Sequence, residues 1–330
     1  MTDSLTLSSA VPAHAAVIAT HGLSKSFGGV QALKDLTLTV PKNSIFGFLG
    51  PNGAGKTTTI KLLLGLIQPS AGGGSVFGLD ILKNSVEIRS RIGYLPQDPR
   101  FYEDLTARQT LRFTAGFFFK GPKNAIEERV QEMLELVELE GKADRPIKGF
   151  SGGELQRLGI AQAQVNYPDL LILDEPAASL DPMGRHDILE LMERLRKYTT
   201  IFYSTHILND VERVSDTVAI LNKGELVSYG PIGTLLAGSE GPAYTITVVG
   251  VSASLQEQVR LQNWVRSIQI SASEDGKATW VIEVSDSEAA EAQLLRLVLA
   301  EPQARVLDFR RRTYELEDVF MQIVEGSHVG

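Results

Sequence analysis

The sequence predicts an α/β fold that carries an inserted helical subdomain and is followed by a small α+β domain. Three patterns support this prediction. Short apolar runs alternate with helical patterns from Val17 to Ile232, which is typical of an α/β domain. The β pattern disappears between Asp98 and Tyr167, where only helical periodicity is found. After residue 242 a new order of strands and helices begins.

Apolar runs define the strands of the first domain. Four of them predict buried strands, namely Ser44–Leu49, Ile92–Leu95, Leu170–Leu173 and Thr200–Ser204. Two more runs, Val218–Leu221 and Leu226–Tyr229, predict a hairpin that turns at Asn222-Lys223-Gly224. Within the insertion, helical periodicity predicts helices over residues 106–119 and 124–139.

The domain boundaries follow from these patterns. We expect a disordered tail over 1–16, the α/β domain over 17–232 with its helical subdomain at about 98–167, a linker over 233–242, and an α+β domain over 243–330. The last domain has the order βαββαβ, which is typical of a split-βαβ fold, and a final helix is expected from Glu315. Trp264 and Trp280 are expected in its core.

Composition excludes several classes of protein. The 330 residues carry a net charge of −8 and include no cysteine, so disulfide frameworks, cysteine-ligated metals and thiol catalysis are excluded. The acidic balance argues against binding nucleic acid by bulk charge. Apolar runs are far shorter than the ~20 residues that a bilayer requires, and the first 16 residues lack the basic start of a signal peptide. We therefore expect a soluble intracellular protein with two domains.

The phosphate-binding pattern G-x-x-x-x-G-K-[ST] is matched by Gly50-Pro51-Asn52-Gly53-Ala54-Gly55-Lys56-Thr57. Glycines allow backbone N–H groups to converge on phosphate oxygens where a Cβ atom would intrude. A predicted strand precedes the loop and a helix follows it, so the helix N-terminus also favours an anion. In this pattern Lys56 reaches the β- and γ-phosphates of a nucleotide, and the Thr57 hydroxyl ligates Mg²⁺.

Two carboxylates follow the apolar strand Leu170–Leu173. In an open parallel sheet, ligands bind at the carboxyl ends of the strands. This position allows Asp174 to hold Mg²⁺ and Glu175 to polarise the attacking water. An Asp-Glu pair is common in loops, but beside a phosphate-binding loop it indicates a site. Gln97 and His206 follow two other apolar strands, and we expect them at the same edge of the sheet.

A second anion-binding element is predicted at Ser151-Gly152-Gly153. Ser151 and Glu154 match a capping box, which explains a helix start but not two consecutive glycines. The Ser151 hydroxyl and two glycine amides at a helix N-terminus are suited to binding a phosphate. One chain therefore contains two elements that recognise phosphate.

These motifs, over about Val17 to Pro231, resemble the nucleotide-binding subunit of an ABC transporter. In that family the Ser-Gly-Gly signature of one subunit closes over the γ-phosphate of ATP bound to the other. The resemblance implies a P-loop NTPase fold of ABC type, with MgATP bound at a dimer interface. It also implies a second ATPase subunit, either an identical chain or a different one.

The resemblance assigns roles to further residues. Phe27 matches the aromatic residue that stacks on adenine, and Gln97 matches the Q-loop residue, which senses Mg²⁺ and touches the membrane partner. Asp181 lies in the D-loop match Ser179-Leu180-Asp181, and His206 matches the switch histidine. Glu175, His206 and Gln97 are thus the expected catalytic residues, and Thr57, Gln97 and Asp174 the expected Mg²⁺ ligands. The expected nucleotide-binding residues are Phe27, Gly50, Pro51, Asn52, Gly53, Ala54, Gly55, Lys56, Thr57, Thr58, Ser151, Gly152, Gly153 and Asp181.

The C-terminal segment Tyr314–Phe320 resembles the end of ATPase subunits of ABC-2 type exporters, including the drug-resistance subfamily. The resemblance implies an ATPase that drives export through separate transmembrane permease subunits, at the cytoplasmic face of the cell membrane. Two alternatives remain open at this stage. One is a soluble ABC-type ATPase that acts on DNA or ribosomes, against which the acidic charge and the single cassette argue. The other is an importer ATPase, whose core motifs are the same.

Overall fold

The computed structural model describes residues 16–236, 242–272, 277–312 and 316–317 of the chain. It divides into two compact units, Met1–Ile232 and Gly233–Gly330, each of which is described here by itself. Most of the predicted tail and of the Tyr314–Phe320 segment lies outside the described residues. The described residues include no helix that is both long enough and apolar enough to cross a bilayer.

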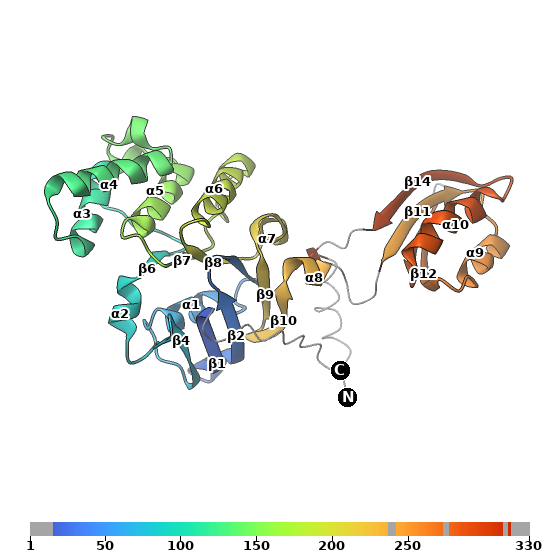
Figure 1. The fold of residues 1–330 in the computed structure, drawn as a ribbon, viewed down its shortest axis with the longest axis horizontal. Helices are drawn as coiled ribbons and strands as arrows, with labels where there is room; N and C mark the ends of the chain where they lie inside the picture. The colour runs from blue at the N-terminus through green and yellow to red at the C-terminus, as the bar shows by residue number, and fades with distance from the viewer. Residues whose placement is uncertain (1–15, 237–241, 273–276, 313–315, 318–330) are drawn as a thin grey trace. The chain divides into compact units, whose positions relative to one another are not determined.

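The first unit contains a six-stranded sheet with the strand order β10-β9-β3-β8-β7-β6 (Figure 1). Its strands from β9 to β6 are parallel, and β10 pairs antiparallel with β9. Lys223 and Gly224 both have positive φ values, 47° and 83°, which is what a two-residue hairpin turn requires. The strands are β3 (Ile45–Leu49), β6 (Ile92–Leu95), β7 (Leu170–Asp174), β8 (Thr200–Thr205), β9 (Thr217–Asn222) and β10 (Glu225–Pro231).

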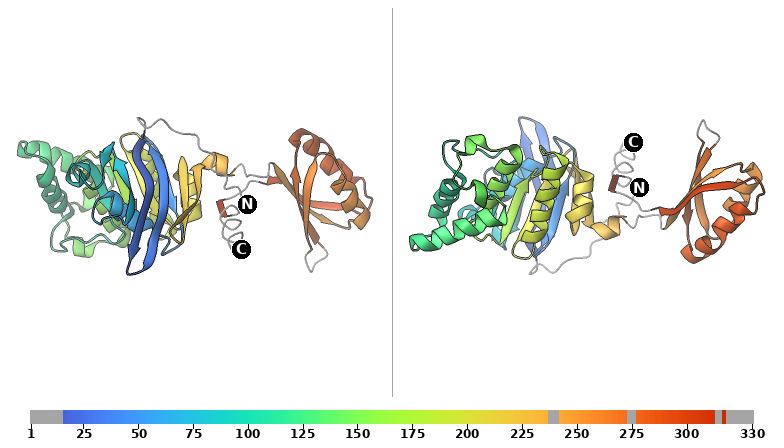
Figure 2. Two further views of the ribbon diagram at one scale, coloured as in Figure 1. Left: turned by 90° about the horizontal axis from the view of Figure 1, so that it is seen from below. Right: turned by 90° about the horizontal axis from the view of Figure 1, so that it is seen from above.

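A second, four-stranded antiparallel sheet with the order β2-β1-β4-β5 belongs to the same unit (Figure 2). The sequence patterns did not predict it. The core between the two sheets is apolar and includes Ile60, Leu62 and Leu63 of helix α1 together with residues of both sheets. The strands are β1 (Ala16–Phe27), β2 (Val30–Pro41), β4 (Ala71–Val76) and β5 (Leu79–Asp80).

The helical insertion consists of α3, α4 and α5, which lie next to β6 in Figure 1. Thr106 starts α3 with a capping box, because its side chain accepts the Gln109 amide and the Gln109 side chain accepts the Thr106 amide. The α-helices of the unit are α1 (Lys56–Leu63), α2 (Ser85–Ser90), α3 (Ala107–Phe118), α4 (Lys123–Leu136), α5 (Gly152–Gln164), α6 (Pro182–Leu195) and α7 (Leu208–Val214). Helix α8 (Ile232–Leu236) begins at the last residue of this unit and continues into the second.

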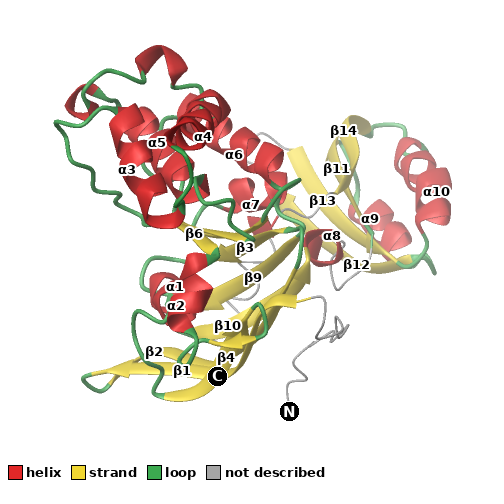
Figure 3. Cartoon of the chain, turned by 60° about the vertical axis from the view of Figure 1, so that its left-hand side comes forward, coloured by secondary structure: helices red, strands yellow, loops and turns green. Residues whose placement is uncertain are grey.

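Between Ala243 and Arg312, the described residues of the second unit have the predicted order βαββαβ. Its strands form one antiparallel sheet in the order β12-β13-β11-β14, and α9 and α10 lie along one face of it (Figure 3). Trp264 and Trp280 are buried in its core, as expected. The elements are β11 (Ala243–Val249), α9 (Ala253–Arg260), β12 (Val265–Ala272), β13 (Lys277–Val284), α10 (Ser287–Leu299) and β14 (Arg305–Arg312). The predicted fold class is confirmed for both units.

The segment predicted as a linker differs in part from the prediction. Residues 233–236 are helical and belong to α8, which begins at Ile232. Glycine and serine in this stretch suggested a linker, yet Ile232, Leu235 and Leu236 provide apolar side chains for a short helix. Residues 237–241 lie outside the described part of the chain.

Candidate functional site

The phosphate-binding loop connects the end of β3 to the start of α1, as the motif predicted. Two glycines are required by close approaches. A Cβ atom on Gly50 would lie 2.4 Å from the Leu221 carbonyl oxygen, and one on Gly55 would lie 2.6 Å from that of Ala32. Gly55 also has a φ of 107°, which L-residues rarely adopt. The loop is therefore shaped by its neighbours before any ligand binds.

Lys56 is buried at the first position of α1, with a side chain that is 5% exposed. Its ammonium donates to the carbonyl oxygens of Gly50 (2.6 Å) and Pro51 (3.3 Å). It also forms an ion pair with Glu175 Oε1 at 3.0 Å. The cation is thus held inside the loop, at the place where the motif requires a positive charge for phosphate.

Thr57 and Asp174 meet across the space between α1 and β7. The Thr57 hydroxyl donates to Asp174 Oδ2 at 2.9 Å, and the Ser204 hydroxyl donates to Asp174 Oδ1 at 2.5 Å. A hydroxyl and a carboxylate oxygen at this separation suit Mg²⁺, which binds few protein ligands and completes its shell with phosphate oxygens and water. In the described part of the chain, no group of three or more His, Asp or Glu side chains is arranged to hold a metal by itself.

Glu175 directly follows β7 and has a φ of 51°, in the left-handed region. Its amide donates to the backbone and side-chain oxygens of Ser204, at 3.1 Å and 3.0 Å. These two hydrogen bonds stabilise the unusual backbone geometry. Its carboxylate is 4% exposed and lies between Lys56 and His206, whose Nδ1 is 2.8 Å from Oε2. The structure therefore brings together five of the predicted residues, Lys56, Thr57, Asp174, Glu175 and His206.

The charges of this cluster contribute to the pKa shifts of two other groups, Tyr94 and Asp210. Burial, and to a lesser extent the Asp174 carboxylate, raises the pKa of Tyr94 to about 12, so its phenol is neutral at physiological pH. Burial also raises the pKa of Asp210 above its usual value, although Arg185 and His206 oppose this shift.

If the chain hydrolyses ATP as its motifs predict, replacing Ser204 by alanine is expected to lower the kcat of that reaction about tenfold. Ser204 is fully buried, and its hydroxyl connects the Asp174 carboxylate to the Glu175 amide. Its loss leaves both groups without one hydrogen-bond partner and less well oriented. Steady-state kinetics with the folded variant measure the effect. Ser44→Ala, which removes a hydrogen bond to the Pro41 carbonyl at the opposite end of β3, is the matched control. A Ser204→Ala enzyme with an unchanged kcat would contradict the prediction.

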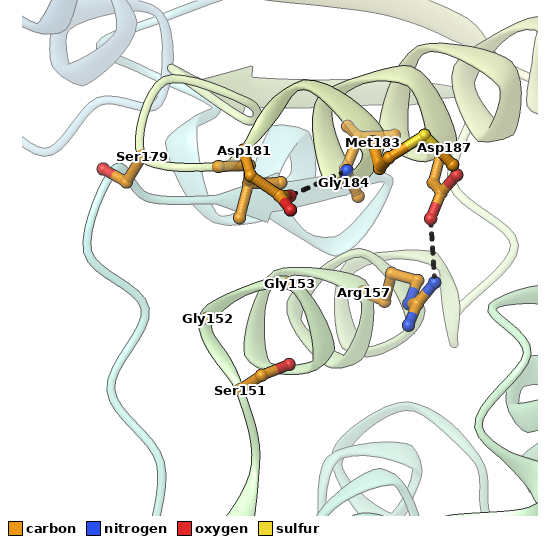
Figure 4. A pocket seen from close by; sticks show the side chains of 11 residues that line it. Ser151, Gly152, Gly153, Arg157, Ser179, Asp181, Met183, Gly184 and Asp187 are labelled. Atoms are coloured by element: carbon orange, nitrogen blue, oxygen red, sulfur yellow. Dashed lines mark hydrogen bonds and ion pairs between the residues drawn. The ribbon is translucent and has the colours of Figure 1, made fainter.

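The predicted second phosphate-binding element lines a separate cavity. Ser151, Gly152 and Gly153 at the start of α5 face the loop and first turns of α6 across a cavity of about 430 Å³ (Figure 4). Asp181 caps α6 by accepting the Gly184 amide at 2.9 Å, and an ion pair at 3.3 Å connects Arg157 of α5 to Asp187 of α6. Ser151 and Asp181 therefore share this cavity.

Two other predicted residues, Gln97 and Phe27, are exposed. Gln97 lies two residues beyond the end of β6, the strand that pairs with β7. Phe27 ends β1 with 48% of its surface exposed, and the Lys25 ammonium lies 4.9 Å from its ring centroid. The roles of all the predicted site residues, including these two and Thr58, stay predictions.

Sequence reasoning missed three features of these sites. Ser204 belongs to a predicted strand but was given no role. Lys142 pairs with Glu154 at the start of α5, and Arg157 pairs with Asp187. Charged residues of opposite sign are common at these separations along a chain, so no pattern in the sequence distinguishes these pairs from solvated charges.

Comparison with known proteins identifies relatives of this chain. Residues 33–178 match the family model described as "ABC transporter". The chain is 36% identical to the uncharacterized ABC transporter ATP-binding protein YxlF of Bacillus subtilis, over 94% of this chain and all of that protein. It is 35% identical to the Nod factor export ATP-binding protein I of Burkholderia lata, over 91% of this chain and 94% of that protein.

A solved structure supports the same assignment. The dimeric structure of MJ0796, a bacterial ABC transporter cassette, superposes with a TM-score of 0.60 at 25% sequence identity. The match covers 65% of this chain and 98% of that cassette. The shared region has the size of the first unit alone.

Proposed function

We propose, from the premise that this chain belongs to the ABC transporter family as an ATP-binding subunit, that it hydrolyses MgATP between two cassettes to drive export. Nucleotide binding and ATPase activity are properties of this family. The dimeric site, the Mg²⁺ ligands, the membrane partner and the direction of transport are parts of our proposal.

The observation that carries the dimer is the presence of two phosphate-binding elements in separate places. Lys56 and the carboxylates of β7 form one cluster, whereas Ser151, Gly152 and Gly153 line a cavity with Asp181. If a second cassette places its Ser151 segment over the Lys56 cluster, each ATP contacts both copies. The dimer of the related cassette MJ0796 supports this arrangement by analogy.

The residues of the cluster have distinct roles in the proposed mechanism. Thr57 and Asp174 would hold Mg²⁺, which when bound would neutralise charge on the phosphates. Lys56 leaves the Gly50 and Pro51 carbonyls to bind the γ-phosphate. Glu175 accepts a proton from the attacking water, and His206 orients the Glu175 carboxylate from its other side. The Ser204 hydroxyl holds the Asp174 carboxylate and the Glu175 amide in position relative to each other.

Export is the direction that the relatives favour. The Burkholderia protein, which carries "export" in its name, is similar to both units of this chain. An importer ATPase has the same core motifs and is the alternative that this similarity disfavours. A nucleic-acid ATPase is disfavoured by the net charge of −8.

Exposed aromatic side chains on the helical insertion are suited to contact a membrane subunit at the cytoplasmic face of the membrane. Tyr102, Phe113 and Phe117 are 70%, 53% and 71% exposed, and their rings form edge contacts with centroids 6.3 Å and 5.0 Å apart. Aromatic residues are enriched at protein interfaces. Tyr102 lies five residues after Gln97, for which a contact with the membrane partner is predicted.

Purification of the tagged chain from detergent-solubilised membranes of its own cells tests the class of function. We expect a protein with several membrane spans to co-purify, and its recovery to fall at least about tenfold in a Phe113→Ala/Phe117→Ala variant. Leu261→Ala, which removes an equally exposed apolar side chain from the second unit, is the control. Recovery of ribosomes or DNA instead would support the nucleic-acid alternative. In vesicles whose ATPase subunits face the medium, accumulation of a transported substrate inside would indicate export, and its loss from the vesicles would indicate import.

A further inference from the structure

A buried carboxylate lies in the first turn of α5, beside the Ser151 phosphate-binding segment. Glu154 is 7% exposed. Its Oε2 accepts the Ser151 amide at 2.7 Å, and the Ser151 hydroxyl accepts the Glu154 amide at 3.3 Å. These two bonds complete the capping box that the sequence predicted. The carboxylate therefore belongs to the same helix turn as the groups proposed to bind phosphate.

This position creates an electrostatic conflict. The helix N-terminus stabilises a carboxylate and a phosphate for the same reason, so the two anions compete for the same positive potential. Their repulsion grows when a dimer interface excludes water and lowers the local dielectric constant. An uncompensated Glu154 would therefore oppose the approach of a γ-phosphate to Ser151, Gly152 and Gly153.

Lys142 supplies the opposite charge. Its ammonium donates to Glu154 Oε1, the carboxylate oxygen that the Ser151 amide does not use. Lys142 ends a short 3₁₀ helix, Glu140–Lys142, and the buried side chains of Leu139 and Ala143 anchor this segment on both sides. The Lys142 hydrogen bond, aided by the Ser151 amide, holds the pKa of the Glu154 carboxyl below its usual value, so the carboxylate is ionised at physiological pH.

We propose that Lys142 is a positioning residue of the second phosphate-binding element, whose ammonium cancels the Glu154 charge so that ATP bound to a partner cassette can approach Ser151. The inference rests on the proposed function, because it requires a nucleotide to face this element across a dimer. The two charges act as a pair, so the Lys142 ammonium is needed only when Glu154 carries its negative charge.

The full chain in a Glu175→Gln background, which is expected to retain MgATP, provides the assay. The measured quantity is the MgATP concentration at which half of the chain is dimeric by light scattering. We expect Lys142→Met to raise this concentration about tenfold and Lys142→Arg to keep it within about twofold. When Glu154→Gln is also present, adding Lys142→Met should change the concentration less than about twofold. The Lys142→Met defect should also shrink when salt is raised, since screening weakens the repulsion.

Two measurements separate this role from a merely structural one. The affinity of monomeric Lys142→Met for a fluorescent ATP analogue, which depends on the Lys56 cluster, should equal that of the parent and show that the variant is folded. Lys148→Met is the matched control, because Lys148 is 64% exposed and its ion pair with Asp104 is long, at 3.9 Å. It should leave dimerisation within about twofold.

Several outcomes would overturn the inference. A Lys142→Met defect that is equally large with and without Glu154→Gln would mean that the lysine holds the 3₁₀ segment rather than cancels the charge. Dimerisation of Lys142→Met at the parent's MgATP concentration would remove the effect altogether. If the parent chain itself forms no MgATP-dependent dimer, the proposed function fails and the inference falls with it, which the parent measurement alone reveals.

Discussion

Replacing Glu175 by glutamine is expected to lower steady-state ATP hydrolysis at least about 100-fold while MgATP binding persists. Of the two carboxylates that directly follow or end β7, Asp174 is a predicted Mg²⁺ ligand and Glu175 is not. The Glu175 carboxylate lies between Lys56 and His206 and is 4% exposed. Glutamine keeps the shape of the side chain and can still bond to His206, but it cannot accept a proton from water. The chain should therefore stop after closing on ATP and accumulate as an ATP-bound dimer.

Two measurements check this expectation. Phosphate release gives the rate of hydrolysis, and light scattering with MgATP gives the proportion of dimer. Glu225→Gln makes the same chemical change on the surface of the first unit, where Glu225 is 60% exposed and pairs with Lys34. This control should hydrolyse ATP at the parent rate and show no stable dimer. Hydrolysis by Glu175→Gln within a few-fold of the parent rate would contradict the assignment of Glu175 as the base.

The central cluster could be predicted from the sequence because its parts follow a simple rule. Lys56, Asp174, Glu175 and His206 each follow an apolar strand, and parallel strands end at the same edge of a sheet. In the structure Glu175 contacts both Lys56 and His206, and Ser204 connects Asp174 to the Glu175 amide. The strand pattern and one specific loop motif therefore fixed which residues meet, although not the contacts between them.

The antiparallel sheet could not be predicted from periodicity, for reasons visible in its strands. β1 and β2 pair with several register shifts. These shifts interrupt the alternation of side chains between the two faces of the sheet, which is the pattern that identifies a strand. β4 begins Ala71-Gly72-Gly73-Gly74, a composition typical of a loop. A Cβ atom on Gly72 would lie 2.0 Å from the Gly22 carbonyl oxygen, so glycine is present because β1 approaches closely.

Residues that act through others were invisible for a different reason. Ser204 is one of six consecutive buried residues in β8, and only the structure shows its hydroxyl between Asp174 and Glu175. The pairing of Lys142 with Glu154 depends on how the 3₁₀ segment packs against α5, which is a tertiary contact between segments 12 residues apart. A charge pattern in the sequence gives the sign of each residue but not its partner.

Replacing Lys56 by methionine is expected to abolish ATP binding and also to destabilise the nucleotide-free chain. Lys56 and Glu175 form a buried ion pair with side chains 5% and 4% exposed. Removing the cation leaves the Glu175 carboxylate with His206 as its remaining side-chain partner, and such a loss costs about 3 kcal/mol of unfolding free energy. For a unit of this size, the midpoint of thermal unfolding should fall by about 6 to 12 °C.

The double variant Lys56→Met/Glu175→Gln separates stability from binding. Because glutamine is neutral, most of the lost thermal stability should return, whereas ATP binding should not, since no cation is restored in the loop. Lys34→Met is the control: its pair with Glu225 is exposed, so the midpoint should move by less than about 3 °C. A double variant no more stable than Lys56→Met would mean that the buried pair does not stabilise the free chain. If the prediction holds, the ion pair that stabilises the nucleotide-free chain is the one that ATP must break, because a Lys56 bound to the γ-phosphate releases Glu175 to act on water.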